Sequence, residues 1–187
     1  LRVKKANKLD AELMEHLNDL MVPNAVFKTH IQKGHNTMSG YDPVEYMISL
    51  NPGEDLKPLA KVASGGELSR LMLGLKTIFT SLNGMETIIF DEIDTGVSGP
   101  VATAIGKKMK LISKNTQLFA ITHLAQVASF ADTHYFVHKS FEWNKTTTEI
   151  TELNRKEVIE QLALISAGNI SEASISAAEE LYEANHG

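Results

Sequence analysis

The sequence contains no cysteine, only one tryptophan, and no run of apolar residues long enough to cross a membrane. Without cysteine the chain can form neither disulfides nor thiolate metal sites. A membrane-spanning helix needs about 20 apolar residues, so none is expected. The net charge is −5, so the chain carries no overall positive field for nucleic acid. Any DNA contact would have to come from a local patch or from another part of the protein.

The composition that remains is that of a globular domain, with 43% hydrophobic and 22% charged residues in 187. Residues 1–20 carry leucines at helical spacing and predict an amphipathic helix, which Pro23 should end. Residues 25–31 and 44–50 alternate apolar and polar side chains. This alternation predicts two strands that pair in antiparallel fashion.

A second half with a different pattern follows. Helical spacing runs from residue 68 to 82, and Gly74 within it indicates a closely packed neighbour. Residues 87–90 and 117–121 are short apolar runs of the kind buried in parallel sheets. Residues 133–139 and 146–153 predict a hairpin, and two capped helices complete the chain. The order predicts an α/β fold with a mixed, mostly parallel sheet flanked by helices.

The stretch VASGGELSR precedes the helix that begins near residue 66. Ser64 and Glu67 have the spacing of a capping box, in which each side chain bonds the other's backbone N–H. A capping box does not require Gly65 and Gly66 between its partners. Glycine is useful where another group approaches the backbone closely, and exposed N–H groups at a helix start attract phosphate. The stretch is therefore either a plain cap or a phosphate site.

Two carboxylates follow the apolar run at residues 87–90. Asp91 and Glu92 lie at the carboxyl end of the predicted strand, where ligands bind in open α/β sheets. One carboxylate can hold Mg²⁺, and the next can orient and activate an attacking water. Adjacent acids are also common as turn and cap residues, and this alternative remains open.

The third polar segment follows residues 117–121. His123 comes just after this predicted strand and is expected beside the end of the strand that carries Asp91 and Glu92. A lone histidine is more often structural than catalytic, but this placement favours a role in the same site. Between the two strands, residues 94–99 form a glycine-rich loop that leads into a helix.

The order and spacing of these segments resemble the ABC-type ATPases. Ser64–Glu67 is similar to the ABC signature, Thr87–Glu92 to a Walker B strand, Asp94–Ser98 to a D-loop and His123 to the switch histidine. Three segments of the sequence resemble the bacterial SMC-like ATPases of double-strand-break repair: PLAKVASGGELSR, IIFDEIDTGVSGP and ITHLAQVASFADTHYFV. The resemblance covers essentially the whole chain, and each motif by itself is weak.

The resemblance implies a site shared between two heads, with ATP between them. Ser64, Gly65 and Gly66 would contact the γ-phosphate held by the opposite protomer, with Glu67 in the same motif. Asp94 would couple the two sites across the dimer. These residues act on the nucleotide of the partner copy.

The same resemblance assigns the remaining residues to the nucleotide of their own head. Asp91 would hold Mg²⁺ through water, and Glu92 would act as general base or orient the attacking water. His123 would contact the γ-phosphate. The implied cofactors are ATP and Mg²⁺.

One element of this chemistry is missing. The phosphate cradle has the pattern Gly-x-x-x-x-Gly-Lys-Ser/Thr. The chain's one Gly-Lys pair, Gly106-Lys107, has Val101 in place of the first glycine and Lys108 in place of Ser or Thr. In the family, the cradle belongs to an N-terminal half joined by a long coiled coil. We therefore expect this chain alone to bind ATP poorly and to hydrolyse it negligibly.

The resemblance also predicts the domain organisation. Residues 1–22 would be the returning end of the coiled-coil helix, and residues 23–187 the C-terminal lobe of the ATPase head. Twenty residues cannot establish a heptad repeat, so an ordinary surface helix remains the alternative. The chain opens without an initiator methionine, which suggests a piece of a longer protein.

The expected partners are the N-terminal Walker A half, a second head and DNA, with no membrane, in the cytoplasm at the nucleoid. Two alternatives remain at this stage. An ABC transporter subunit would usually carry glutamine at the position of Glu67. A non-catalytic interaction module would be indifferent to the loss of the Glu92 carboxylate.

Overall fold

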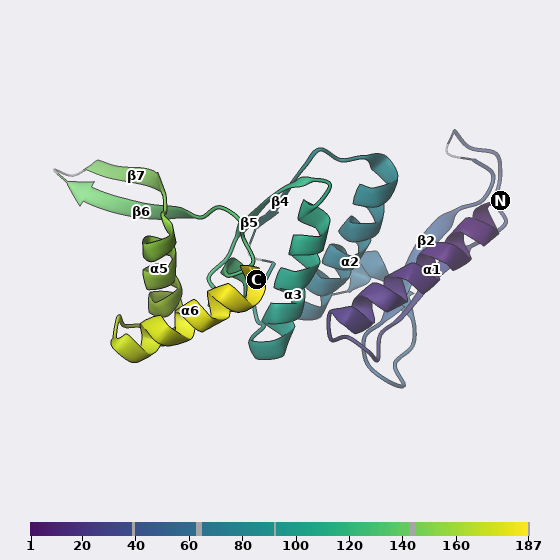
Figure 1. Ribbon diagram of the computed structural model, residues 1–187. Coiled ribbons are helices and arrows are strands. Elements are labelled where there is room, and N and C mark those ends of the chain that lie inside the picture. Colours follow the sequence, from purple (N-terminus) through teal and green to yellow (C-terminus); the bar gives the residue numbers. More distant parts are fainter. Residues whose placement is uncertain (39, 63–64, 92, 143–144, 187) are drawn as a thin grey trace. The chain divides into compact units, whose positions relative to one another are not determined.

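The computed structural model describes residues 1–38, 40–62, 65–91, 93–142 and 145–186. The chain divides into two compact units, each with its own packing (Figure 1). The first unit comprises Leu1–Val97 and Ile112–Ile121, and the second comprises Ser98–Leu111 and the chain from Thr122 onwards.

The first unit contains the predicted N-terminal helix, the antiparallel strands and the helix that follows the VASGGELSR stretch. Its elements are α1 (Arg2–Asp19), β1 (Val26–Ile31), β2 (Val44–Ser49), β3 (Lys57–Pro58), the 3₁₀ turn Leu59–Lys61, α2 (Gly66–Asn83), β4 (Thr87–Asp91) and β5 (Gln117–Ile121). Strand β2 pairs antiparallel with both β1 and β3, as the alternation predicted for the first pair.

The core of the first unit lies where α1, α2 and the β1–β2 pair meet. Leu13 and Leu17 of α1 and Leu71 of α2 are completely buried, and Phe27 of β1 is nearly so. They belong to one apolar cluster that also includes Ile48 of β2. Burial of each such side chain is worth about 1.5–3 kcal/mol. The amphipathic pattern of α1 is therefore used to hold α2 against the sheet.

Helix α1 ends before the predicted stop at Pro23. The Val22 N–H donates to the Leu17 carbonyl at 2.8 Å, and the Met21 N–H donates to Asn18 at 3.1 Å. Met21 has a φ of 60°, so the chain turns in the left-handed conformation that closes a Schellman motif. The helix thus ends through its own backbone hydrogen bonds.

A carboxylate of α1 fixes that helix to the sheet. Asp10 accepts hydrogen bonds from the Thr29 backbone N–H at 3.0 Å and from the Thr29 hydroxyl at 2.6 Å. Thr29 lies in β1, so Asp10 satisfies a strand N–H on the side that faces away from β2. Helix α1 is therefore fixed to β1 by polar contacts as well as by its leucines.

Strands β4 and β5 pair in parallel, with Asp91 opposite Ile121. The predicted parallel pairing is confirmed, but the prediction that both strands are fully buried is wrong. Ile89 is 67% exposed, Phe119 44% and Ile121 58%. No described residue of the first unit covers that face, so it presents apolar side chains, while Ile88 and Phe90 are buried in the core.

The α/β class is confirmed, but the described strands form three small sheets, and parallel pairing is limited to β4 and β5. The parallel pair needs a crossover connection, and α3 (Gly99–Ser113) lies between its strands in the chain. The other pairs are antiparallel and need none. The expectation of one mostly parallel sheet is therefore wrong for the described part of this chain.

The second unit contains most of α3 and the C-terminal elements. These are α4 (Ala125–Ala128), the hairpin β6 (Tyr135–Glu142) and β7 (Lys145–Glu152), α5 (Arg155–Ala167) and α6 (Glu172–His186). Figure 1 shows the hairpin extending away from α5 and α6. Among the described helices, none is both long and apolar enough to span a bilayer.

The predicted capping of the last two helices is confirmed. Asn154 accepts from the N–H of Glu157, whose carboxylate accepts from the N–H of Asn154. The Ser171 hydroxyl accepts from the N–H of Ser174 at the start of α6. Helices α5 and α6 pack with α4 around a separate apolar cluster that includes Leu162.

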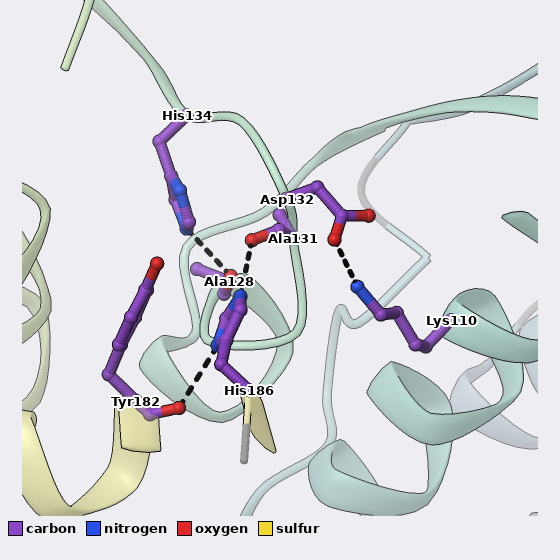
Figure 2. A network of polar contacts seen from close by, with 7 residues as sticks. All are labelled: Lys110, Ala128, Ala131, Asp132, His134, Tyr182 and His186. Carbon is purple, nitrogen blue, oxygen red and sulfur yellow. Dashed lines mark hydrogen bonds and ion pairs between the residues drawn. The ribbon is translucent and has the colours of Figure 1, made fainter. Parts of the chain in front are cut away.

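A polar network ties the segment after α4 to the last turn of α6 (Figure 2). The His134 Nε2–H donates to the Ala128 carbonyl at 2.8 Å. His186 directs its two ring nitrogens at the carbonyls of Tyr182 and Ala131, each at 3.0 Å. Carbonyls only accept, so a protonated His186 ring makes both bonds and a neutral ring makes one.

Several groups of this network shift the pKa of His134. Burial lowers the pKa of His134 below its ordinary value of 6.5, and the bond to Ala128 opposes that shift. His186 lowers the pKa further, and the Asp132 carboxylate raises it. Asp132 also forms an ion pair with Lys110 of α3. The fold therefore favours neutral His134.

We expect Gly74→Val to destabilise the first unit. A Cβ at Gly74 would lie 3.0 Å from Leu13 Cδ1 and 3.4 Å from His16 Cβ, so the larger side chain forces α1 and α2 apart. The expected loss is about 1–3 kcal/mol of unfolding free energy in urea titrations. Lys76→Val, at an exposed position of α2, is the control. Equal stability of the two variants would contradict close packing of α1 on α2.

The lowered pKa of His134 predicts a pH-dependent stability. Between its folded pKa and 6.5 the unfolded chain binds more protons than the folded one. The His134 contribution is therefore complete above pH 6.5 and declines as the pH falls toward the folded value. Thermal unfolding from pH 7.5 to 5 should show a smaller decline in His134→Gln than in the parent. His30→Gln, at an exposed site, should keep the parent slope.

Candidate functional site

Helix α2 begins at the VASGGELSR stretch, but not with the predicted capping box. The N-cap residue is Gly65, with extended backbone at φ −179° and ψ 173°, and no side chain of the described residues caps the helix there. Glu67 is thereby the second helical residue, one short of the capping-box position. Ser64 lies outside the described residues. The predicted cap by Ser64 therefore stays a prediction, and within the described residues the first N–H groups of α2 have no side-chain cap.

Gly65 and Gly66 are not required by close contacts with other described residues of the first unit. A Cβ added to Gly65 would meet no atom within 4 Å, and its extended φ suits any residue. A Cβ on Gly66 would make ordinary contacts of 3.4 Å with the Thr95 carbonyl oxygen and Val97 Cγ1. Neither the packing nor the backbone of the described chain requires glycine here. Close approach of another group to the backbone is a physical reason for glycine at both positions.

The loop after β4 lies against this helix start. Asp94 is completely buried, and the Val97 N–H donates to the Asp94 carbonyl at 3.3 Å. Gly96 closes this tight turn at a φ of 73°, a conformation that favours glycine. The contacts of Gly66 with Thr95 and Val97 place the loop beside the first turn of α2. The structure thus brings two of the predicted motifs together.

A shallow hollow of about 300 Å³ lies between the start of α2 and the end of β4. It is lined by Gly65, Leu68, Ser69, Met72, Ile89, Phe90, Asp91 and Ile93. These residues supply one carboxylate and no basic side chain, so the hollow does not suit a triphosphate by itself. Asp91 is exposed at its edge, at the carboxyl end of β4. Glu92 lies outside the described residues.

Arg70 is a charged residue of this region that the motif analysis overlooked. It lies one turn after Gly66 on α2 and is only 9% exposed. Its Nε is buried and has no hydrogen-bond partner among the described residues. Burial lowers the pKa of this guanidinium, and the Glu67 carboxylate opposes that shift. The sequence shows an arginine at the end of VASGGELSR, but it does not show that this side chain is buried.

His123 lies in the second unit, between β5 and α4. Its side chain is exposed. The Leu124 N–H donates to the Thr122 hydroxyl at 3.1 Å, which orders the turn on both sides of His123. Helix α4 follows directly, and the network of Figure 2 holds the residues after it. The turn that carries His123 is therefore held in place at both ends.

The metal chemistry of the described residues is limited. No cluster of three or more His, Asp or Glu side chains that could hold a metal ion is found in the part that the structure describes. Asp91 is the one predicted metal ligand, and a single exposed carboxylate suits Mg²⁺. This ion keeps several waters and takes few protein ligands when phosphates supply the rest.

Comparison with known proteins gives a consistent relationship, although no family model matches the chain. The chain is 43% identical to the DNA repair protein RecN of Halalkalibacterium halodurans over 192 residues, covering 98% of this chain and 34% of that protein. It is 41% identical to RecN of Bacillus subtilis, covering 90% and 32%, and 38% identical to RecN of Vibrio cholerae, covering 96% and 33%. The chain spans about a third of these relatives.

Solved structures show the fold. An Smc head domain with a coiled coil and joint from Pyrococcus yayanosii superimposes with a TM-score of 0.65 at 19% identity, covering 86% of this chain and 29% of that one. A structure from a study of ATP-driven dimerisation and DNA-stimulated activation of SMC ATPases has a TM-score of 0.58 at 20% identity, covering 88% and 93%.

These relatives do not favour the transporter subunit or the interaction module. The three curated relatives are named as DNA repair proteins, and the two structures are SMC ATPase heads. The chain is therefore a RecN-family sequence with the fold of an SMC ATPase head, and it corresponds to about a third of a RecN protein.

Proposed function

We propose that this chain is the C-terminal part of an ATPase head that acts in DNA double-strand-break repair and recombination. ATP binding drives two heads together, and hydrolysis releases them. The observation that carries the proposal is the start of α2, where two glycines that the packing does not require leave backbone N–H groups open to a phosphate. The kinship with RecN and the SMC head fold support it.

In this mechanism the start of α2 serves the nucleotide of a second head. Ser64, Gly65 and Gly66 contact its terminal phosphate, with Glu67 in the same first turn. Asp94 couples the two sites through its loop, and the contacts of Thr95 and Val97 beside that turn support this role. Backbone donors and the helix dipole favour the negative charge that develops during phosphoryl transfer.

The remaining residues serve the nucleotide of their own head. Asp91 holds Mg²⁺ through water, and its exposed position at the end of β4 supports this role. The ion would neutralise charge on the phosphates when bound. Glu92 orients the attacking water and accepts its proton, and His123 contacts the terminal phosphate.

The Walker A cradle belongs, in this proposal, to an N-terminal half that is absent from the chain. The exposed apolar face of β4 and β5 supports such a partner, because Ile89, Phe119 and Ile121 have no cover in the first unit. The length of the relatives leaves room for it, and α1 would be the returning end of a coiled coil. The partners are then this half, a second head and DNA, in the cytoplasm at the nucleoid.

The uncovered face predicts that the chain by itself associates with other copies. Light scattering should show a mass that rises with concentration, and Ile89→Lys should lower that mass because a charge interrupts the apolar face. Val26→Lys, at a 50% exposed site of β1, is the matched control. A monomeric parent, or equal effects of both substitutions, would argue against this face as the contact.

The role of Glu92 predicts the behaviour of the complete protein. Glu92→Gln should lower ATP turnover by about 100-fold or more, because the amide cannot accept the proton of the attacking water. Association of heads on adding ATP should persist in this variant. Glu86→Gln, an exposed carboxylate just before β4, should leave turnover unchanged. Normal turnover in Glu92→Gln would contradict the assigned role.

A further inference from the structure

The buried guanidinium of Arg70 is not explained by the contacts of the described chain. Arginine carries five N–H donors, and buried donors are nearly always satisfied. Arg70 is 9% exposed, and its Nε is fully buried without a hydrogen-bond partner among the described residues. Removing such a donor from water without an acceptor opposes folding. A residue kept here despite that cost points to an interaction outside the described chain.

The position of the guanidinium makes its environment more unfavourable still. Its Nη1 lies 3.5 Å from the point where a Gly66 Cβ would be, and Val97 Cγ1 and the Thr95 carbonyl oxygen lie 3.4 Å from that point. The cation is therefore beside the first turn of α2, which is the positive end of the helix dipole. Glu67 is the nearby counter-charge, and it is partly exposed to water.

A buried cation and backbone N–H groups that no described side chain caps lie at the same helix end. Both features favour an anion with more than one negative charge. We infer that Arg70 is a positioning residue that attracts the terminal phosphate of a nucleotide, bound to a second copy of the head, onto the first turn of α2. It acts through the N–H groups of that turn. The inference rests on the proposed function, which places this turn against the partner's nucleotide.

The test uses the complete protein in the Glu92→Gln background, so that bound ATP persists. Arg70→Met keeps the aliphatic packing and removes the charge, and Arg70→Lys keeps a charge. Lys76→Met is the control, because Lys76 is an exposed cation of the same helix. Two quantities are measured: the affinity of the dilute monomer for a fluorescent ATP analogue, and the ATP-dependent dimer dissociation constant by sedimentation.

Arg70→Met should raise the dimer dissociation constant at least about tenfold, the scale of one lost charge interaction near a phosphate. Arg70→Lys should raise it much less, and Lys76→Met should leave it unchanged. The ATP affinity of the monomer should stay the same in all three, because Arg70 acts on the partner's nucleotide. The difference between the parent and Arg70→Met should shrink at high salt, because screening weakens a charge effect.

Other results separate the two ideas. A parent that never associates with ATP would overturn the proposed function and this inference together. A parent that associates, with Arg70→Met associating equally well, would overturn the role of Arg70 alone. Equal weakening by Arg70→Met and Arg70→Lys, insensitive to salt, would show a packing role in place of a charge role. Should thermal unfolding show that Arg70→Met does not fold, the Arg70→Lys comparison and the salt series of Arg70→Gln decide.

Discussion

The first unit depends on how α2 is held along most of its length while its first turn stays partly exposed. Leu71 and the apolar side chains that follow it pack against α1 and the β1–β2 pair, and Gly74 lets Leu13 approach closely. A helix fixed in this way holds its first turn in a defined direction. Movement of that turn would have to move α1 as well, because the same leucines bury both helices.

Electrostatics decides what that first turn can bind. The helix dipole, the first N–H groups of α2 and the buried Arg70 all add positive potential at one place. Glu67 offsets only part of it. A neutral or positive ligand would gain little there, whereas a phosphate would be stabilised by each of these contributions. Asp94 is buried beside this turn, and its carbonyl accepts a hydrogen bond from the Val97 N–H.

Two further features show a molecule shaped for contacts beyond the described chain. The β4–β5 face leaves Ile89 and Ile121 more than half exposed, and the hollow beside Asp91 carries no basic residue. Each exposed large side chain forgoes its burial energy, so this face agrees with the partner half proposed above. The RecN relatives are about three times as long, which fits this description.

The sequence by itself determined the order of helices and strands, the antiparallel and parallel pairings, the Asn154 capping box and the series of motifs. Each of these follows from local spacing or from chemistry within a few residues. Tertiary structure decided the rest. Only the structure shows that Gly65 is the N-cap of α2 and that one face of β4–β5 is exposed. It also shows that Arg70 is buried beside Gly66. Periodicity shows which side chains share a face, but burial depends on what distant segments place against that face.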